Sequence, residues 1–358
     1  MALWVDRQRP KTLATLTYHV EQAQRLKQIV SSGDFPHLLV YGPDGAGKKT
    51  RIHCILRELF GVGAEKLRIE QREFQAPSGK KLEITSVVSN YHIEINPSDV
   101  GIYDRVVVQE LIKSMAQTQN IGCAAASDPA RSFRVVVLTE AESLSRDAQH
   151  ALRRTMERYA STCRLVLCCQ STGRLIEALR SRCLALRVPA PTDQQVISAL
   201  ESAASQAGAT PLSAELSRAV ARKSNGNLRR ALLMLEACYV QNGNLTTNKT
   251  VEPEWETYLK GTSEVIVQKQ APDTLLRARE RFYELLGRCI PATTIFERLL
   301  SELLRSCDSA LKPEIVALAS EYEHRLNLGS KDIYHLEAFV AKFMLVYAKY
   351  MEKTFAGF

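Results

Sequence analysis

The chain has 358 residues, of which 45% are hydrophobic and 24% are charged, a composition typical of a globular protein with two or three domains. Its nine cysteines include no C-x-x-C pair, so neither a disulfide framework nor a zinc site is indicated. There is no charged-then-apolar leader, and no apolar run approaches the ~20 residues of a membrane span. These features exclude the secreted and membrane classes, and they predict a soluble protein of a reducing, intracellular compartment.

The formal net charge of +8 is concentrated in one part of the chain. Between Arg146 and Arg187 there are nine arginines and only three acidic residues. Such a concentration favours an anionic partner, either a nucleic acid or the phosphate of a neighbouring subunit. A solvated basic surface is the simpler alternative, and the sequence leaves it open.

A glycine-rich loop lies between two contrasting segments. The apolar run 37–41 before it is typical of a buried strand, and the segment 51–59 after it is typical of a helix. Three glycines allow backbone N–H groups to turn inward around a phosphate, the helix directs its N-terminus at that charge, and Lys48 reaches the β- and γ-oxygens. The sequence therefore predicts a nucleotide-binding P-loop. Its residues are Gly42, Pro43, Asp44, Gly45, Ala46, Gly47, Lys48, Lys49 and Thr50.

Two positions are unusual for an ATPase that hydrolyses its own nucleotide. The residue after the P-loop lysine normally carries a hydroxyl that binds Mg²⁺, but here it is Lys49. Thr50 cannot replace it, because one step along a helix rotates a side chain by about 100°. A later buried run ends in Thr139 and Glu140, where an Asp-Glu pair would supply the metal-side acid and the water-activating carboxylate. We therefore expect weak or absent Mg²⁺ binding and little hydrolysis. A shifted register, with Glu140 at the metal and Glu142 at the water, is the alternative that would restore activity.

Periodic patterns outline the rest of the chain. Further apolar runs predict strands at 91–96, 133–138, 164–169 and 184–188, and two alternating runs at 67–70 and 82–85 suggest a hairpin insertion. After a Pro-Ala-Pro hinge at 189–191, the pattern is helical throughout. Short amphipathic helices at about 193–241 would form a lid, and longer helices follow from residue 251.

Several short motifs recur together in one known family. They are Trp4-Val5-Asp6 with Arg9-Pro10, the P-loop at 42–50, Gln149 with the segment 151–157, Ser181-Arg182-Cys183, and Gly-Asn-Leu-Arg-Arg at 226–230. On these motifs the chain resembles the small subunits of replication factor C, in the clamp-loader branch of the AAA+ ATPases. The Ser-Arg-Cys motif is specific to clamp loaders. The Lys-Lys-Thr end of the P-loop and the missing aspartate further point to one type of small subunit.

The resemblance implies an α/β fold in three parts. A P-loop AAA+ domain with a five-stranded parallel sheet would occupy residues 1–188, and a small helical lid domain would occupy residues 189–250. An all-α collar at 251–358 would join five subunits in a ring. For the last part, a self-contained helical bundle is the alternative.

The resemblance also implies roles in the chain's own nucleotide site. Val5, Arg9 and Pro10 would border the adenine, and Lys48 would hold phosphate. Arg229 would be the lid arginine that senses the bound nucleotide. The implied cofactor is ATP or ADP.

Three arginines would act outside that site. By resemblance, Arg182 would be the catalytic residue, an arginine finger offered in trans to the γ-phosphate of a neighbouring subunit. Arg146 and Arg105, near predicted helix starts, would contact DNA phosphates. Two positions depart from the family pattern, since Gln170 replaces the usual sensing Asn and Gln8 replaces a tyrosine.

The sequence and the resemblance together predict a subunit of the pentameric clamp loader of the nucleus. With one large and three other small subunits, it would load a ring clamp onto primer-template DNA during replication and repair. Two other classes stay open. An autonomous P-loop ATPase acting on nucleic acid would show steady turnover as a purified chain, and an assembly scaffold would bind no nucleotide and would tolerate a change of Lys48.

Overall fold

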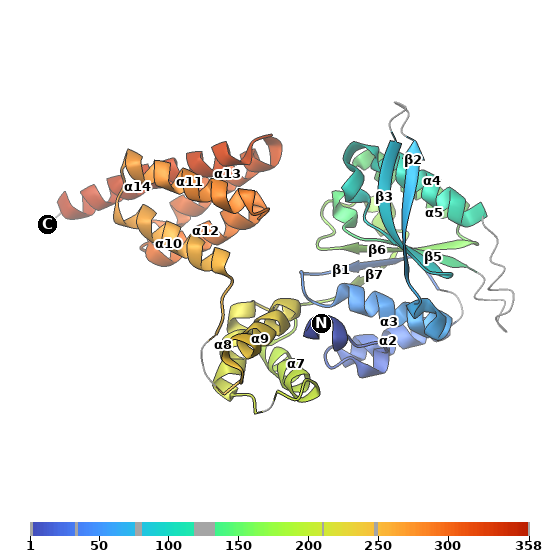
Figure 1. Ribbon diagram of the computed structural model, residues 1–358. Coiled ribbons are helices and arrows are strands. Elements are labelled where there is room, and N and C mark those ends of the chain that lie inside the picture. The colour runs from blue at the N-terminus through green and yellow to red at the C-terminus, as the bar shows by residue number, and fades with distance from the viewer. Residues whose placement is uncertain are drawn as a thin grey trace. The chain divides into compact units, whose positions relative to one another are not determined.

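The computed structural model describes residues 3–32, 35–75, 81–117, 133–209, 211–246 and 250–356. The chain forms two compact units, Met1–Thr250 and Val251–Phe358, which are coloured blue to yellow and orange to red in Figure 1. The further division of the first unit at residue 188 stays a prediction. No helix among the described residues is both long and apolar enough to cross a membrane.

A mixed sheet of seven strands organises the first unit (Figure 1). The strands are β1 Leu38–Tyr41, β2 Arg68–Gln75, β3 Lys81–Val88, β4 His92–Ile95, β5 Arg134–Leu138, β6 Cys163–Cys169 and β7 Leu184–Arg187, in the spatial order β2-β3-β4-β5-β6-β1-β7. Strands β4, β5, β6, β1 and β7 are parallel neighbours, which confirms the predicted five-stranded parallel sheet. The hairpin β2–β3 extends this sheet, because β3 pairs antiparallel with β4 through Val88 and Ile93.

Alternation along the parallel strands fills two cores, one on each face of the sheet. In β5, Val136 and Leu138 enter one core while Val135 and Val137 enter the other. Both sets are buried, as expected for a parallel strand covered on both faces. The sequence of this β-branched strand is therefore continuously apolar, although successive side chains point to opposite faces of the sheet.

Helices cover both faces of the sheet. The helices of this part are α1 Trp4–Arg7, α2 Val20–Ser31, α3 Lys48–Phe60, α4 Asp104–Gln117, α5 Arg146–Arg158 and α6 Glu177–Arg180, with 3₁₀ turns η1 Leu13–Thr15, η2 Gly61–Glu65, η3 Pro97–Tyr103 and η5 Ala141–Ser143. Apolar residues of α2 and α3 pack into one core, and those of α4 and α5 pack into the other. Figure 1 shows these two pairs on opposite sides of the strands.

Three helices complete the first unit, namely α7 Asp193–Gln206, α8 Ala214–Ser224 and α9 Leu228–Asn242. The N-terminal segment contacts two of them. The rings of Trp4 and Tyr239 lie 5.3 Å apart, centroid to centroid, and the backbone N–H of Trp4 donates to Glu236 at 3.1 Å. The side-chain amide of Gln8 donates to the carbonyl of Ala203 at 2.8 Å. These contacts place residues 4–8 beside α7 and α9.

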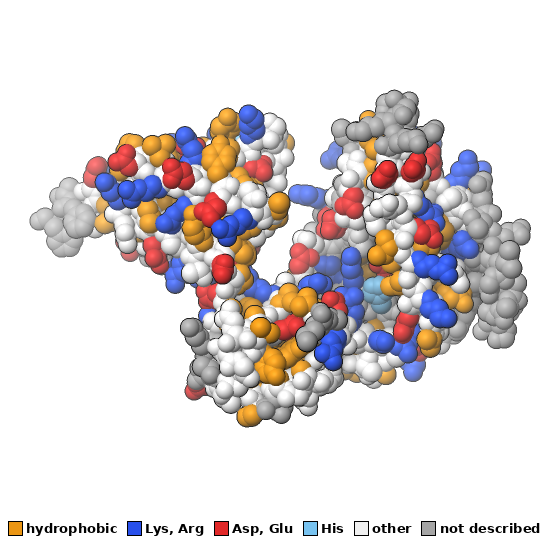
Figure 2. All heavy atoms as spheres, viewed as in Figure 1, with side chains coloured by type: hydrophobic (Ala, Val, Ile, Leu, Met, Phe, Trp, Pro, Cys, Tyr) orange, Lys and Arg blue, Asp and Glu red, His pale blue; other side chains and the backbone are white. Residues whose placement is uncertain are grey.

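The second unit is a helical bundle with its own core. Its helices are α10 Glu254–Gln268, α11 Pro272–Gly287, α12 Ala292–Ser306, α13 Lys312–Leu328 and α14 Asp332–Ala356. Phe296 and Phe339 meet at 4.7 Å between ring centroids in this core. On the face shown in Figure 2, hydrophobic side chains of this unit lie among acidic and basic ones.

Candidate functional site

The P-loop joins the end of β1 to the start of α3, and its three glycines have positive φ angles of 152°, 71° and 85° at Gly42, Gly45 and Gly47. A Cβ atom at each position would collide with a neighbour. It would lie 2.0 Å from the carbonyl oxygen of Val188, 1.9 Å from Oδ1 of Asn227 and 2.1 Å from the hydroxyl of Tyr18, respectively. Both the backbone angles and the surrounding atoms therefore require glycine.

The loop ends in a helix start suited to an anion. Gly47 is the N-cap of α3 and offers no capping side chain, so the first N–H groups of the helix can bind an anionic ligand. The Lys48 ammonium donates to the carbonyls of Gly42 at 2.6 Å and Pro43 at 3.1 Å and lies 3.5 Å from the Asp44 carboxylate. Lys48 is thus held over the loop, where a phosphate would be bound.

Tyr18 and Arg51 support the loop from behind. The Tyr18 hydroxyl donates to the carbonyl of Ala46 at 3.0 Å, and the Arg51 guanidinium lies 5.0 Å from the centre of the Tyr18 ring. Arg51 is fully buried and donates to the Tyr18 carbonyl at 3.2 Å. Burial raises the pKa of Tyr18, so the phenol keeps its proton. The sequence analysis missed both residues, because no local pattern links Tyr18 to a loop about 28 residues later.

A cavity of about 800 Å³ opens above the loop. Its wall combines the N-terminal segment, the loop, the ends of β5 and β6, and the helices α7 and α9. The predicted site residues that line it are Val5, Arg9, Pro10, Asp44, Gly45, Gly47, Lys48, Lys49, Thr50 and Arg229. Of the remaining predicted loop residues, Gly42, Pro43 and Ala46 lie outside this lining, and Ala46 is buried beneath the loop.

Arg229 enters the cavity from the first turn of α9. Asn227 caps that helix by accepting a hydrogen bond from the backbone N–H of Arg230 at 2.9 Å. The same Asn227 amide lies against Gly45 of the loop. One side chain therefore links the lid helix that carries Arg229 to the phosphate loop.

The metal side of the cavity carries Lys49 and Thr139, where a P-loop ATPase usually offers a hydroxyl and an aspartate to Mg²⁺. The Thr139 hydroxyl donates to the carbonyl of Ile95 at 3.3 Å, and this side chain is only 6% exposed. Lys49 brings a positive charge to the cavity wall at the position that normally supplies a hydroxyl. Among the described residues, no group of three or more His, Cys, Asp or Glu side chains is placed to hold a metal ion.

Besides Asp44 of the P-loop, two carboxylates nevertheless line the cavity. Glu140 has a positive φ of 53° and accepts a hydrogen bond from Asn96 at 3.4 Å. Glu142 accepts from the backbone N–H of Gln170 at 3.1 Å, and the Gln170 amide donates to Asp44 at 2.7 Å. Gln170 thus connects the strand ends of β5 and β6 to the P-loop.

Cysteine chemistry is disfavoured in the cavity. Cys168 and Cys169 line it at the end of β6. Burial raises the pKa of Cys168 to about 11 and that of Cys169 to about 12. Both thiols are therefore protonated at neutral pH and are poor nucleophiles.

The three other predicted arginines lie elsewhere. Arg182 follows α6 and does not line the cavity; its guanidinium contacts Glu157 at the end of α5. Arg105 and Arg146 are exposed in the first turns of α4 and α5. Arg105, Arg146 and Arg182 are therefore not among the residues that line the cavity.

Comparison with known proteins identifies the family. Relatives from Mus musculus and Homo sapiens, both described as replication factor C subunit 3, are 56% and 55% identical over 358 residues, which is 100% of this chain and 99% of each relative. A Neurospora crassa relative described as replication factor C subunit 5 is 49% identical over 352 residues, 98% of this chain and 99% of the relative. This chain belongs to the replication factor C subunits. The type of small subunit indicated by the Lys-Lys-Thr loop end is therefore confirmed as subunit 3 of vertebrates and subunit 5 of fungi.

Three family models match successive parts of the chain. The model described as replication factor C subunit 3, C-terminal domain, matches residues 255–351, and the RCF1/5-like AAA+ ATPase lid domain matches residues 199–240. The model described as DNA polymerase III, delta subunit, matches residues 18–192.

Solved structures support the fold alone. A RuvB variant of Thermotoga maritima has a TM-score of 0.52 at 17% identity, covering 83% of this chain and 91% of that one. The ORC1 protein of Aeropyrum pernix, solved in complex with DNA, has a TM-score of 0.51 at 16% identity, covering 96% of this chain and 86% of that one. The P-loop AAA+ fold predicted from the sequence is confirmed.

Proposed function

We propose that this chain is a small subunit of the pentameric clamp loader that places a ring-shaped sliding clamp on primer-template DNA in the nucleus. Its partners would be one large and three other small replication factor C subunits, the clamp and the DNA. The observation that carries the proposal is a cavity lined by the P-loop in a chain that is similar over its full length to replication factor C subunits. The test is reconstitution with the other subunits, followed by a clamp-loading assay on primed DNA.

In its own site the chain would bind ATP or ADP and hydrolyse it poorly or not at all. The loop amides and Lys48 would hold the phosphates, while Val5, Arg9 and Pro10 would border the base and Arg229 would close over the nucleotide. Weak hydrolysis follows from the Lys49 charge and from the Thr139 hydroxyl, which is already hydrogen-bonded to the sheet. This part of the proposal rests on the cavity lining.

Two variants should therefore show that nucleotide binding and ATP hydrolysis at this site are independent of each other. Lys48→Ala should weaken nucleotide binding, because the main phosphate cation is lost, whereas Glu140→Gln should change the ATPase rate of the complex little. A large rate loss in Glu140→Gln alone would show that this site is catalytic. Nucleotide affinity is measured on the purified chain, and the ATPase rate on the reconstituted complex.

The arginine-finger role assigns Arg182 to chemistry in a different polypeptide. A guanidinium beside a γ-phosphate stabilises the charge that develops during phosphoryl transfer. The position of Arg182 supports this role, because the residue lies outside the chain's own cavity and its side chain is about one-third exposed. Arg182→Ala should preserve assembly and this chain's nucleotide binding but suppress hydrolysis at the one neighbouring site that it serves.

Exposed apolar and aromatic side chains on the second unit support its proposed role as the collar. Leu276, Tyr283 and Tyr334 are half or more exposed on α11 and α14. The Glu337 carboxylate and, to a smaller extent, the two tyrosines raise the pKa of Arg279 above its ordinary value. Exposed aromatic and apolar side chains around an arginine are typical of protein interfaces. Replacing Tyr283 and Tyr334 by serine should reduce incorporation into the pentamer, measured as native mass and as the identity of co-purifying chains.

An autonomous ATPase is the second candidate, because Glu140 and Glu142 both line the cavity as the shifted register requires. Under that alternative the purified chain alone would turn over ATP steadily, and Glu142→Gln would abolish the turnover. Absence of turnover by the chain alone, with turnover by the assembled complex, favours the clamp-loader subunit.

A further inference from the structure

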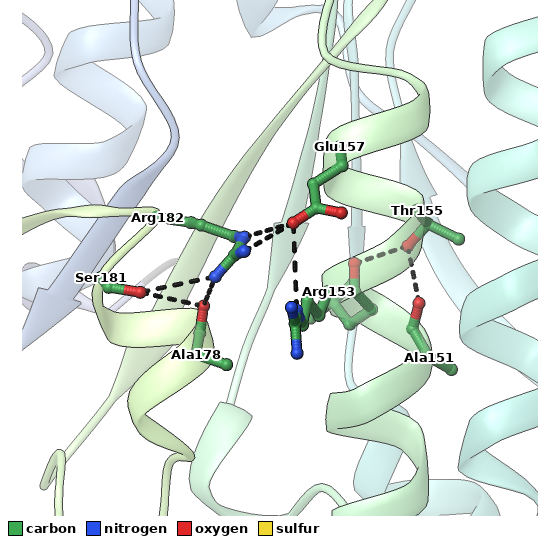
Figure 3. Close-up of polar contacts among 8 residues, drawn as sticks. Ala151, Arg153, Thr155, Glu157, Ala178, Ser181 and Arg182 are labelled. Atoms are coloured by element: carbon green, nitrogen blue, oxygen red, sulfur yellow. Dashed lines mark hydrogen bonds and ion pairs between the residues drawn. The ribbon is translucent and has the colours of Figure 1, made fainter.

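The guanidinium of Arg182 contacts other residues of this chain on two of its edges. Nε donates to Oε1 of Glu157 at 2.7 Å, and Nη2 forms an ion pair with the same oxygen at 2.6 Å. Nη1 donates to the carbonyl oxygen of Ala178 at 2.8 Å, and the Ser181 hydroxyl lies 3.5 Å from the same nitrogen. Figure 3 shows the guanidinium between the end of α5 and the turn of α6.

These contacts leave part of the guanidinium available. The group has five N–H donors in one plane. Glu157 lies at the edge formed by Nε and Nη2, whereas Nη1 donates to Ala178 and, at 3.5 Å, to Ser181. The terminal edge of the fork, which suits two oxygens of a phosphate, is therefore not covered by Glu157.

We propose that Glu157 is a positioning residue for Arg182, which fixes the guanidinium so that its terminal edge is presented to the γ-phosphate of the neighbouring subunit. This inference rests on the proposed role of Arg182 as an arginine finger in trans. A free arginine side chain samples many rotamers, and ordering it in the transition state would slow the reaction. Glu157 and Ala178 impose that order before the neighbouring nucleotide arrives.

The surroundings of Glu157 support a role in orientation rather than in stability. Its side chain is about half exposed, and exposed ion pairs contribute little to folding. Its other basic neighbour, Arg153, lies 3.9 Å away and so makes a much weaker contact. A short hydrogen bond and an ion pair to one carboxylate oxygen, together with a hydrogen bond to a backbone carbonyl, set Arg182 apart from a mobile surface arginine.

The test uses reconstituted complexes in which only the site served by Arg182 can hydrolyse ATP. Glu157→Ala should lower kcat about tenfold and leave KM for ATP unchanged, because the loss falls in the transition state. Glu157→Gln should lose less, since it keeps an acceptor oxygen without the charge. Adding Glu157→Ala to Arg182→Ala should cause no further loss, because the residue to be positioned is already absent.

A matched control is Glu177→Ala, which removes an exposed carboxylate in the first turn of α6 that does not contact the Arg182 guanidinium; its kcat should equal that of the wild type. Unchanged kcat in Glu157→Ala, with a loss in Arg182→Ala, would overturn the positioning role alone. A raised kcat in Glu157→Ala would also overturn the positioning role, because Glu157 would then hold Arg182 away from the neighbouring γ-phosphate. If Arg182→Ala itself has no effect, the proposed function in trans fails, and the role of Glu157 fails with it.

Discussion

Asp104 and Ser145 tie together the first turns of α4 and α5. The buried Asp104 carboxylate accepts hydrogen bonds from the Ser145 backbone N–H at 2.6 Å and from its hydroxyl at 2.9 Å. It also accepts from the N–H of Arg105 at 2.6 Å, while Ser145 caps α5 through Ala148. Arg105 and Arg146, each one residue after a member of this pair, are therefore exposed at two helix starts that are held at a set spacing.

Asp104→Ala should lower the free energy of unfolding by about 2–3 kcal/mol, because three donors lose a charged acceptor in a buried place. The control is Asp147→Ala in the exposed first turn of α5. That change should cost well under ~1 kcal/mol, since only an interaction with the helix dipole is lost. Chemical denaturation of both variants measures the difference, and equal losses would contradict the bridging role.

Arg105→Ala and Arg146→Ala should each weaken DNA binding by the assembled complex. If each arginine contacts one duplex phosphate, each variant should also reduce the slope of log affinity against log salt by roughly 0.9. Sequence preference should not change, because phosphate contacts carry no base information. Arg218→Ala, an exposed arginine on α8, serves as the control. An unchanged slope for Arg146→Ala would make that residue only a surface charge.

Gly45→Ala should weaken nucleotide binding about tenfold or more, since a positive φ of 71° strains alanine. The new Cβ would also lie 1.9 Å from Oδ1 of Asn227, which cannot move away without uncapping α9. Asn227→Gly should restore part of the affinity by removing the clash. The comparison is Gly173→Ala, where the nearest atom is 3.6 Å from the new Cβ. Titration calorimetry with ADP measures all three, and equal affinities for Gly45→Ala and Gly173→Ala would contradict the contact.

Stability of the first unit should fall as the pH drops from about 6.5 to about 4, through His92. Burial lowers the pKa of His92 from 6.5 to about 4; its Nε2 has no partner among the described residues, and Nδ1 contacts Ser89 at 2.8 Å. In this window the unfolded chain binds the proton and the folded chain does not, so acid favours unfolding, by about 3 kcal/mol over the whole window.

Native-state hydrogen exchange of the β4 and β5 amides at several pH values measures this loss. His92→Phe cannot titrate and should flatten the dependence, whereas replacing the exposed His324 with Asn should leave it intact. A pH dependence that survives in His92→Phe would assign the loss to other groups.

Arg182→Lys should restore little of the activity that Arg182→Ala removes at the neighbouring site. A single ammonium cannot bond Glu157, the Ala178 carbonyl and a phosphate in one plane, as the guanidinium fork can. Turnover of the complex that depends only on that site provides the measurement. Near-wild-type turnover with lysine would show that charge alone is sufficient.

The sequence by itself determined the elements whose signal is local. The alternating run at 133–138, the glycines of the P-loop and the period of α14 each predict their structure, because neighbouring residues share one strand, turn or helix face. The five parallel strands and the chemical departures at Lys49 and Thr139 could be predicted for the same reason.

Only the tertiary structure decided which distant side chains meet. Asn227 lies against Gly45, Tyr18 donates to the loop, and Arg182 donates to Glu157. These contacts join segments that are about 25 to 180 residues apart. No spacing rule encodes such pairs, because they depend on how sheet, lid and helices pack. The addition of β2 and β3 to the sheet likewise required the pairing of Val88 with Ile93, since a hairpin pattern does not specify the strand beside which it lies.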